Sequence, residues 1–439
     1  MEFLMEDEVY RKVKWRIMPL LILCYVVAQI DRTNVGFAKL QFVRDLGFDE
    51  TIYGLGGGIF YLGYLMFEIP SNLYLAKAGV RKTLLRIMVI WGICGIALAL
   101  MSSAAQYYLF RFLLGAGEAG LLPGMFYYLT LWVPASRRAR FTAMFMASVP
   151  IAGTLGGPFS GWIMHGMAGW LGFKGWQWVF VMESIPAIVL GIIAYLCLHD
   201  SPAGCSWLTN AQKETIIRDL ARDRDSQRGG TGPSSFRQTL RDPRVYPVAV
   251  FGFGLFVSTG GIFLWLPTVI RKSGVESTAD IGLLSSIPFL VAFAVQFAVA
   301  RHSDRTLERY WHAVLPALGS ALGWALLPAF STNTPASMAI LTVATAGTLA
   351  AMGPYWTLPA RLCSGAAAAG GIALITSFAG IGGFVSPILV GWLAARSGSL
   401  ATGQYYYSIV LVLGALALWI GMRQDQWHRL RVAYAGSVD

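Results

Sequence analysis

The sequence predicts an all-α membrane protein with twelve transmembrane helices in two pseudo-symmetric six-helix bundles. Hydrophobic residues make up 56% of the 439 residues and charged residues 13%, about half of the charged share of a soluble domain. Apolar runs of about 18 residues or more recur along the chain, and each is long enough to cross a hydrocarbon core. The runs are continuous rather than alternating, which favours helices over the strands of a β-barrel.

The apolar runs place the twelve spans at 17–38, 52–76, 84–103, 106–131, 139–165, 176–198, 245–270, 279–300, 311–330, 335–360, 366–395 and 403–422. A polar stretch follows the sixth span. It divides the chain into an N-terminal six-helix bundle at 1–198, a cytoplasmic linker at 199–244 and a C-terminal six-helix bundle at 245–439.

The two halves carry related patterns. Gly161-Trp162 lies in the fifth span and Gly391-Trp392 in the eleventh, and the two pairs are 230 residues apart, about half of the chain. This spacing agrees with the six-plus-six division and indicates an internal duplication.

The linker contains one helix signal. Thr209 and Gln212 have the spacing of a capping box, and the short apolar stripe after them predicts a surface helix at about 210–223. The Gly/Ser-rich stretch at 226–235 is expected to be flexible.

The basic residues fix the expected orientation. With the N-terminus inside, 26 of the 34 Lys and Arg residues lie in inside segments, six lie in outside loops and two lie within helices. By the positive-inside rule both termini are cytoplasmic. The same asymmetry accounts for the net charge of +11 without a nucleic-acid partner.

Six charged residues stand out within the predicted spans: Asp31 and Arg32 in the first, Glu68 in the second, Arg111 and Glu118 in the fourth, and Glu183 in the sixth. A charge at the bilayer centre costs about 2.5–3.5 kcal/mol on insertion scales, so it needs a partner or a function. Arg111 and Glu118 share a helix face, whereas Asp31 and Arg32 are about 100° apart around theirs. We expect one buried network, in which Arg32 binds an anionic substrate and Asp31 and Glu118 exchange protons.

A purely structural ion-pair network between the two spans is the alternative. Glu68 and Glu183 lie nearer to helix ends, and a structural role is favoured for both.

The second half carries no charge near its span centres, so it is expected to supply shape and neutral contacts. Its candidates for substrate binding are Trp356, Thr357, Thr376 and Ser377. Pro354 and Pro359 flank the first two of these, and prolines distort a membrane helix and open a cavity wall.

Several catalytic motifs are excluded. The GxGxxG match at 115–120 lies inside an apolar span, where small residues favour close helix packing rather than dinucleotide binding. No phosphate-binding loop, HExxH or GxSxG occurs in the sequence. These absences argue against an ATP-driven pump. A membrane-embedded enzyme or a receptor remains the alternative from another functional class, although the missing catalytic motifs also disfavour the enzyme.

Short charged loops follow the second and eighth spans. Arg81 lies in the first loop, and Asp304 and Arg305 lie in the second. Equivalent positions in two halves predict a cytoplasmic gate latch, with ordinary positive-inside anchoring as the alternative.

The chain resembles the major facilitator superfamily over nearly its whole length, and within it the anion:cation symporter family. The resemblance rests on Asp31 to Ala38, Phe67 to Asn72, Arg111 to Gly124, Ser303-Asp304-Arg305, Gly353 to Trp356 and Gly382-Gly383-Phe384. It implies that Asp31 and Glu118 are protonation sites, that Arg32 contacts a substrate carboxylate with Arg111 nearby, and that Tyr64 and Trp356 line the cavity.

The resemblance implies a proton-coupled importer of an organic carboxylate that works by alternating access. Many relatives have two asparagines where this chain has Ile375 to Phe384, and their absence favours a compact or aromatic dicarboxylate, such as tartrate or phthalate, over a sugar acid. An uncoupled facilitator or an exporter of organic anions is the rival. We expect a monomer in the cell inner membrane that uses the proton gradient and needs no cofactor, no metal and no nucleic acid.

Overall fold

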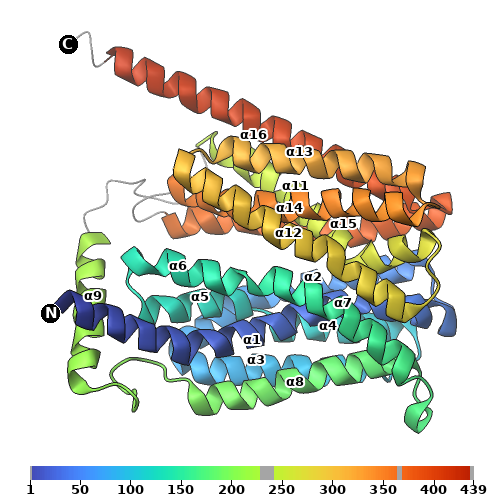
Figure 1. Cartoon of the computed structure of the whole chain (residues 1–439), viewed down its shortest axis with the longest axis horizontal. Coiled ribbons are helices and arrows are strands. Elements are labelled where there is room, and N and C mark those ends of the chain that lie inside the picture. Colours follow the sequence, from blue (N-terminus) through green and yellow to red (C-terminus); the bar gives the residue numbers. More distant parts are fainter. Residues whose placement is uncertain (1, 228–241, 363–367, 436–439) are drawn as a thin grey trace. The chain divides into compact units, whose positions relative to one another are not determined.

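The computed structural model describes residues 2–227, 242–362 and 368–435, and every regular element in these ranges is a helix (Figure 1). Contacts divide the chain into two compact units. We call Met1–Phe48 with Ile59–Gly229 the N-terminal unit, and Asp49–Gly58 with Gly230–Asp439 the C-terminal unit. The predicted linker, 199–244, begins just after α8 (Gly175–Cys197) and ends just before α11 (Val245–Lys272).

The remaining elements follow in chain order: α1 (Glu2–Asp45), α2 (Glu50–Ala78), α3 (Val80–Leu98), α4 (Ala104–Glu118), α5 (Leu121–Trp132), α6 (Ala135–Met146), α7 (Ser148–Gly166), η1 (Trp170–Gly172), α9 (Asn210–Gln227), α12 (Thr278–Thr306), α13 (Tyr310–Leu326), η2 (Leu327–Phe330), α14 (Thr334–Leu362), α15 (Ala368–Ser397) and α16 (Ala401–Ala435). The helices α14 and α15 fall where the tenth and eleventh spans are predicted.

Ten helices in the described ranges are long and apolar enough to cross a membrane. The predicted spans at 84–103 and 139–165 correspond to α3 and to α6 with α7. These helices are not among the ten that are long and apolar enough to cross a membrane. Three basic residues, Arg81, Lys82 and Arg86, lie in the first turns of α3. Glycine and proline lower the hydropathy of α7, which covers most of the other span.

The surface of α12 illustrates how this fold differs from a soluble one. Leu283, Leu290 and Phe297 are 60%, 59% and 64% exposed. Their spacing of seven residues puts them on one helix face. Large apolar side chains exposed in a row along a helix are expected where the solvent is lipid rather than water.

In the N-terminal unit, α1 packs against α7 and α8, and α3 packs against α4 and α8. Glycines bring α2 close to α4: a Cβ on Gly115 would overlap the carbonyl oxygen of Phe60, and a Cβ on Gly63 would overlap that of Phe112. The small residues of the 115–120 stretch thus permit close helix packing, as predicted.

The C-terminal unit is built around α11, which packs against α14, α15 and α16, while α13 packs against α14 and α16. Its buried hydrogen bonds join neutral groups. The hydroxyl of Thr348 lies 2.7 Å from those of Ser258 and Ser320, and the indole of Trp324 donates to Ser258 at 2.8 Å.

The predicted linker helix is confirmed as α9, and so is its capping box. The amide of Gln212 donates to Thr209 Oγ1 at 3.3 Å, and the amide of Thr209 donates to Gln212 Oε1 at 3.2 Å. The helix lies across the N-terminal end of α1 (Figure 1), where Tyr10 donates to Asp219 at 2.9 Å. The stretch at 226–235, predicted to be flexible, lies almost wholly outside the described residues.

Candidate functional site

The centre of the N-terminal unit holds a buried ion pair between α1 and α4. Arg32 donates from Nη2 and Nε to the same oxygen, Glu118 Oε1, at 2.7 and 2.8 Å. The side chain of Glu118 is 0% exposed and that of Arg32 is 18% exposed. The arginine therefore covers the acid, and its own edge is the part of the pair that remains accessible.

Glu118 is only half satisfied. Its second oxygen, Oε2, has no hydrogen-bond partner among the described residues. An ionised carboxylate at this depth depends on Arg32, because a buried charge without its partner costs several kcal/mol. Among the described residues, Arg32 is therefore the partner that balances the charge of Glu118.

Aromatic side chains of α2 surround the guanidinium groups. The Arg32 guanidinium lies 5.3 Å from the ring centroid of Tyr64 and 5.8 Å from that of Phe60. The Arg111 guanidinium lies 4.7 Å from the same Phe60 ring. These distances are typical of cation–π contacts. Tyr64 was predicted from the sequence; Phe60 was missed, although the run Phe60-Tyr61 with Tyr64 marks one aromatic face of span 2.

Asp31 faces away from the Arg32–Glu118 pair. It is 1% exposed. Its Oδ2 accepts a hydrogen bond from the indole of Trp91 in α3 at 2.8 Å, and its Oδ1 accepts from Asn34 at 3.0 Å. The two faces of α1 follow from the helical angle between adjacent residues. Trp91 gave no signal in the sequence analysis, because a lone tryptophan in a membrane span is usually packing material.

The fourth span is broken just after Glu118. Ala119 has a ψ of 131° and Gly120 a φ of +88°, so α4 ends there and α5 begins at Leu121. The positive φ favours glycine. Discontinuous membrane helices commonly line transport sites, because their backbone groups are freed there. The sequence predicts one continuous span at 106–131, and this prediction does not include the break, although Gly120 and Pro123 mark it.

The predicted binding residues of the C-terminal unit lie on α14 and α15. Trp356 is 37% exposed and contacts the ring of Phe256, with centroids 6.2 Å apart. Thr357 donates to the carbonyl of Pro354 within its own helix at 2.8 Å. Thr376 is half-buried and Ser377 is exposed.

The predicted gate residue Arg81 is anchored within the N-terminal unit. Its Nη2 and Nε donate to the carbonyl of Tyr195 at 2.6 and 2.9 Å, and its amide donates to Asp200 at 3.0 Å. Tyr195 lies in the last turn of α8, where a helix attracts positive charge.

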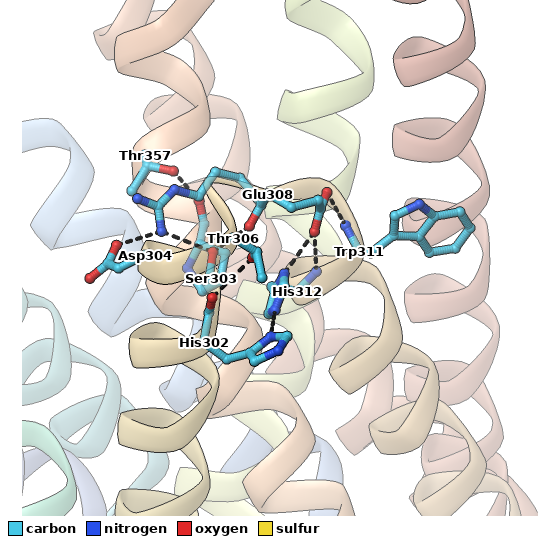
Figure 2. A network of polar contacts seen from close by, with 10 residues as sticks. His302, Ser303, Asp304, Thr306, Glu308, Trp311, His312 and Thr357 are labelled. Carbon is cyan, nitrogen blue, oxygen red and sulfur yellow. Dashed lines mark hydrogen bonds and ion pairs between the residues drawn. The ribbon is translucent and has the colours of Figure 1, made fainter.

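The other predicted gate residues lie in the last turn of α12 (Figure 2). Asp304 pairs with Arg309 at 2.6 Å, and Arg309 also donates to Ser303 at 2.9 Å. The side chain of Asp304 is 69% exposed, and a surface ion pair of this kind contributes at most about 1 kcal/mol. Arg305 is exposed. The latch itself stays a prediction.

The loop between α12 and α13 holds a carboxylate that caps α13 (Figure 2). Glu308 accepts hydrogen bonds from the amides of Trp311 at 2.8 Å and His312 at 3.2 Å, and from His312 Nδ1 at 2.7 Å. His312 Nε2 lies 2.6 Å from Nδ1 of His302. Burial alone would raise the pKa of Glu308, but these hydrogen bonds outweigh it and hold the pKa below its usual value.

Glu308→Ala is therefore expected to loosen the first turn of α13. A lost helix cap costs about 1 kcal/mol, so the Trp311 and His312 amides should exchange hydrogen about fivefold faster at pH 7. A depressed pKa means that the stabilisation is complete above the unfolded value of about 4.3 and is lost as pH falls through the folded value. Acidification below about pH 4 should thus remove the difference between wild type and variant.

Hydrogen exchange measured by mass spectrometry checks this expectation. The exposed Glu276, in the loop before α12, provides the control: Glu276→Ala should leave both amides unchanged. Equal protection of the two amides in Glu308→Ala and wild type at pH 7 would contradict the capping role.

Comparisons with known proteins agree on one family. Residues 21–372 match the family described as Major Facilitator Superfamily. A "Putative metabolite transport protein NicT" of Pseudomonas putida is 40% identical over 404 residues, which cover 92% of each chain. A "Putative tartrate transporter" of Agrobacterium vitis is 39% identical over 421 residues, covering 96% of this chain and 93% of the relative. A "Quinolone resistance transporter" of Acinetobacter baumannii is 38% identical over 420 residues, with 94% and 95% covered.

The fold is also that of solved transporters. The crystal structure of a D-xylose-proton symporter superimposes with a TM-score of 0.74 at 18% identity, covering 92% of this chain and 97% of the other. This likeness confirms the predicted fold class. The named relatives are transport proteins, so the rival of a membrane-embedded enzyme is set aside. The chain therefore belongs to the major facilitator superfamily of multi-pass membrane transporters, as its sequence motifs predict.

Proposed function

We propose that the protein imports an organic carboxylate together with protons across the cell inner membrane. The observation that carries this proposal is the buried Arg32–Glu118 pair, in which the acid is fully buried and the guanidinium stays partly accessible.

The charges of the site explain why a proton and an anion bind together. Two unit charges about 4 Å apart interact by about 4 kcal/mol at the effective dielectric of a protein. While Glu118 is ionised, an anion at Arg32 is repelled by Glu118 about as strongly as it is attracted by Arg32. Protonation of Glu118 removes the repulsion and frees both N–H donors of Arg32. The anion gains its charge-assisted hydrogen bonds only when the proton is present.

A proton on Asp31 would allow the site to bind a dianion in the same way. Asp31, Arg32, Arg111 and Glu118 sum to zero charge when all are ionised. One proton on Glu118 gives a charge of +1 and balances a monoanion. A second proton on Asp31 gives a charge of +2 and balances a dicarboxylate such as tartrate.

The class of substrate is supported by the relatives and by the neutral C-terminal unit. A relative that is 39% identical carries the name of a tartrate transporter. We assign the choice among anions to Trp356, Thr357, Thr376 and Ser377, which offer an indole and three hydroxyls but no amide. A compact dicarboxylate needs fewer hydrogen bonds along its carbon chain than a sugar acid does.

A second candidate function is export. The relative named as a quinolone resistance transporter is 38% identical over 94% of this chain. The aromatic face of Phe60 and Tyr64 beside Arg32 is also suited to a flat aromatic carboxylate.

Uptake into proteoliposomes tests the proposal. Purified protein is reconstituted with an alkaline interior, and accumulation of ¹⁴C-labelled tartrate, phthalate and a quinolone is followed after acidification outside. We expect one of the two dicarboxylates to accumulate above its external concentration and to leave again when a protonophore is added. Equilibration without accumulation would support an uncoupled facilitator. A second set of proteoliposomes has an acidic interior. Accumulation of the quinolone in this set, without accumulation of either dicarboxylate in the first, would support export.

A further inference from the structure

A second buried acid of the N-terminal unit lies near Asp31. Glu183 of α8 is 2% exposed. Its Oε1 accepts a hydrogen bond from the Ser160 hydroxyl of α7 at 2.6 Å. Its Oε2 has no hydrogen-bond partner among the described residues, and within them no Lys or Arg forms an ion pair with it. Its place near the end of a predicted span favours a structural role for this residue.

The surroundings of Glu183 favour the neutral acid. An ionised carboxylate buried without a cation costs several kcal/mol, and such groups are normally protonated instead. A protonated carboxyl has one hydroxyl to donate and one carbonyl to accept. The proton is either on Oε2, with Ser160 donating to Oε1, or on Oε1, with the acid donating to Ser160; both arrangements keep the 2.6 Å hydrogen bond.

Glu183 is coupled to Asp31. Asn34 donates to Asp31 Oδ1 at 3.0 Å and also interacts with the Glu183 carboxyl, and the two acids interact electrostatically. Helices α3 and α8 close tightly around this point. A Cβ on Gly95 would overlap the hydroxyl of Ser184 and would lie 3.7 Å from Asp31 Oδ1.

Like charges that share a buried site do not ionise together. While Asp31 is ionised, Glu183 keeps its proton. When Asp31 takes up a proton, the repulsion disappears and Glu183 is free to release its own. Between these two steps both acids hold a proton, and at the end one O–H bond has formed on Asp31 and one has broken on Glu183. Asn34 has a carboxylate to donate to in either state.

We propose that Glu183 is a proton-binding residue of the transport cycle and works with Asp31 as a coupled pair that always keeps at least one proton. This inference rests on the proposed proton coupling. The other titratable groups that interact with Asp31 are Arg111 and Glu118 of α4 and the thiol of Cys94 in α3.

Infrared spectroscopy tests the protonation state without any substrate. Wild-type protein at pH 7 is expected to show a carboxylic C=O stretch that shifts in D₂O, and Glu183→Gln should lack that band. Ser160→Ala keeps the acid but removes its hydrogen bond, so the band should move to higher frequency. If Glu183→Gln does not fold, the Ser160→Ala shift alone decides the matter. An unchanged band in either variant would overturn the proposal.

Transport tests the role in the cycle. Glu183→Gln should lower gradient-driven uptake of ¹⁴C-tartrate, or of ¹⁴C-phthalate if that is the substrate accumulated by wild type, by about tenfold or more. Counterflow exchange of labelled for unlabelled substrate needs no net proton movement and should stay within about twofold of wild type. Glu276→Gln, which removes an exposed acid from the loop before α12, should leave both activities unchanged.

The two proposals fail separately. If wild type shows no gradient-driven uptake, the proposed function fails, although the infrared band of Glu183 stands. If wild type is gradient-driven and Glu183→Gln is equally so, only the role of Glu183 is wrong.

Discussion

Glu118→Gln is expected to separate substrate movement from the proton gradient. Glutamine has nearly the same shape but neither takes up nor releases a proton at physiological pH. In this variant Arg32 permanently lacks its anionic partner, which in wild type lies 2.7 Å away. The site then resembles the protonated wild-type state at every pH. Substrate should bind without a proton at position 118, and any dependence of binding on pH that remains should come from Asp31.

The expected magnitude is large. Positioned proton transfer contributes about 10²–10⁴-fold in enzymes, and uphill uptake should fall by about 100-fold or more, to background. Counterflow in the same proteoliposomes should remain within about threefold of wild type. Glu276→Gln serves as the control for removal of a carboxyl outside the site and should accumulate substrate normally. Wild-type accumulation by Glu118→Gln would show that the proton binds elsewhere.

Arg32→Lys is expected to weaken substrate binding while it preserves the fold. Lysine keeps the positive charge, so Glu118 is not left as an unpaired buried charge, a loss that costs about 3–5 kcal/mol. It does not keep the planar fork, from which Arg32 now donates through both Nη2 and Nε. A hydrogen bond to a charged group is worth about 1.5–3 kcal/mol, which corresponds to an increase in Kd of about 10- to 150-fold.

Equilibrium binding of ¹⁴C-tartrate or ¹⁴C-phthalate to purified protein measures this effect, and the Tm reports on the fold. Arg86→Lys is the matched control. Arg86 donates to Ser71 and lies 4.9 Å from the ring of Tyr74, so its replacement removes a guanidinium outside the site. We expect an unchanged Kd for Arg86→Lys. An unchanged Kd for Arg32→Lys as well would assign the anion to another residue.

Much of the site could be predicted because charges are rare in membrane spans. Asp31, Arg32, Arg111 and Glu118 are conspicuous in apolar runs, and their cost in lipid indicates a function without any knowledge of their neighbours. Glu183 is equally conspicuous, but its place near the predicted end of a span led to a structural reading. Its contacts with Ser160 and Asn34 come from two other helices, so the sequence alone does not reveal them.

The sequence by itself determined the fold class. In lipid the backbone of a continuous apolar run must satisfy its own hydrogen bonds, and a helix does so. It also determined local features whose partners lie within one turn, such as the capping box of Thr209 and Gln212. Only the tertiary structure decided that Arg32 pairs with Glu118 while the adjacent Asp31 is bound by Trp91 and Asn34. The physical reason is that neighbouring residues on a helix point about 100° apart. Which helix covers each face depends on close packing at glycines such as Gly95 and Gly115, and that packing is a property of the assembled helices rather than of any one segment.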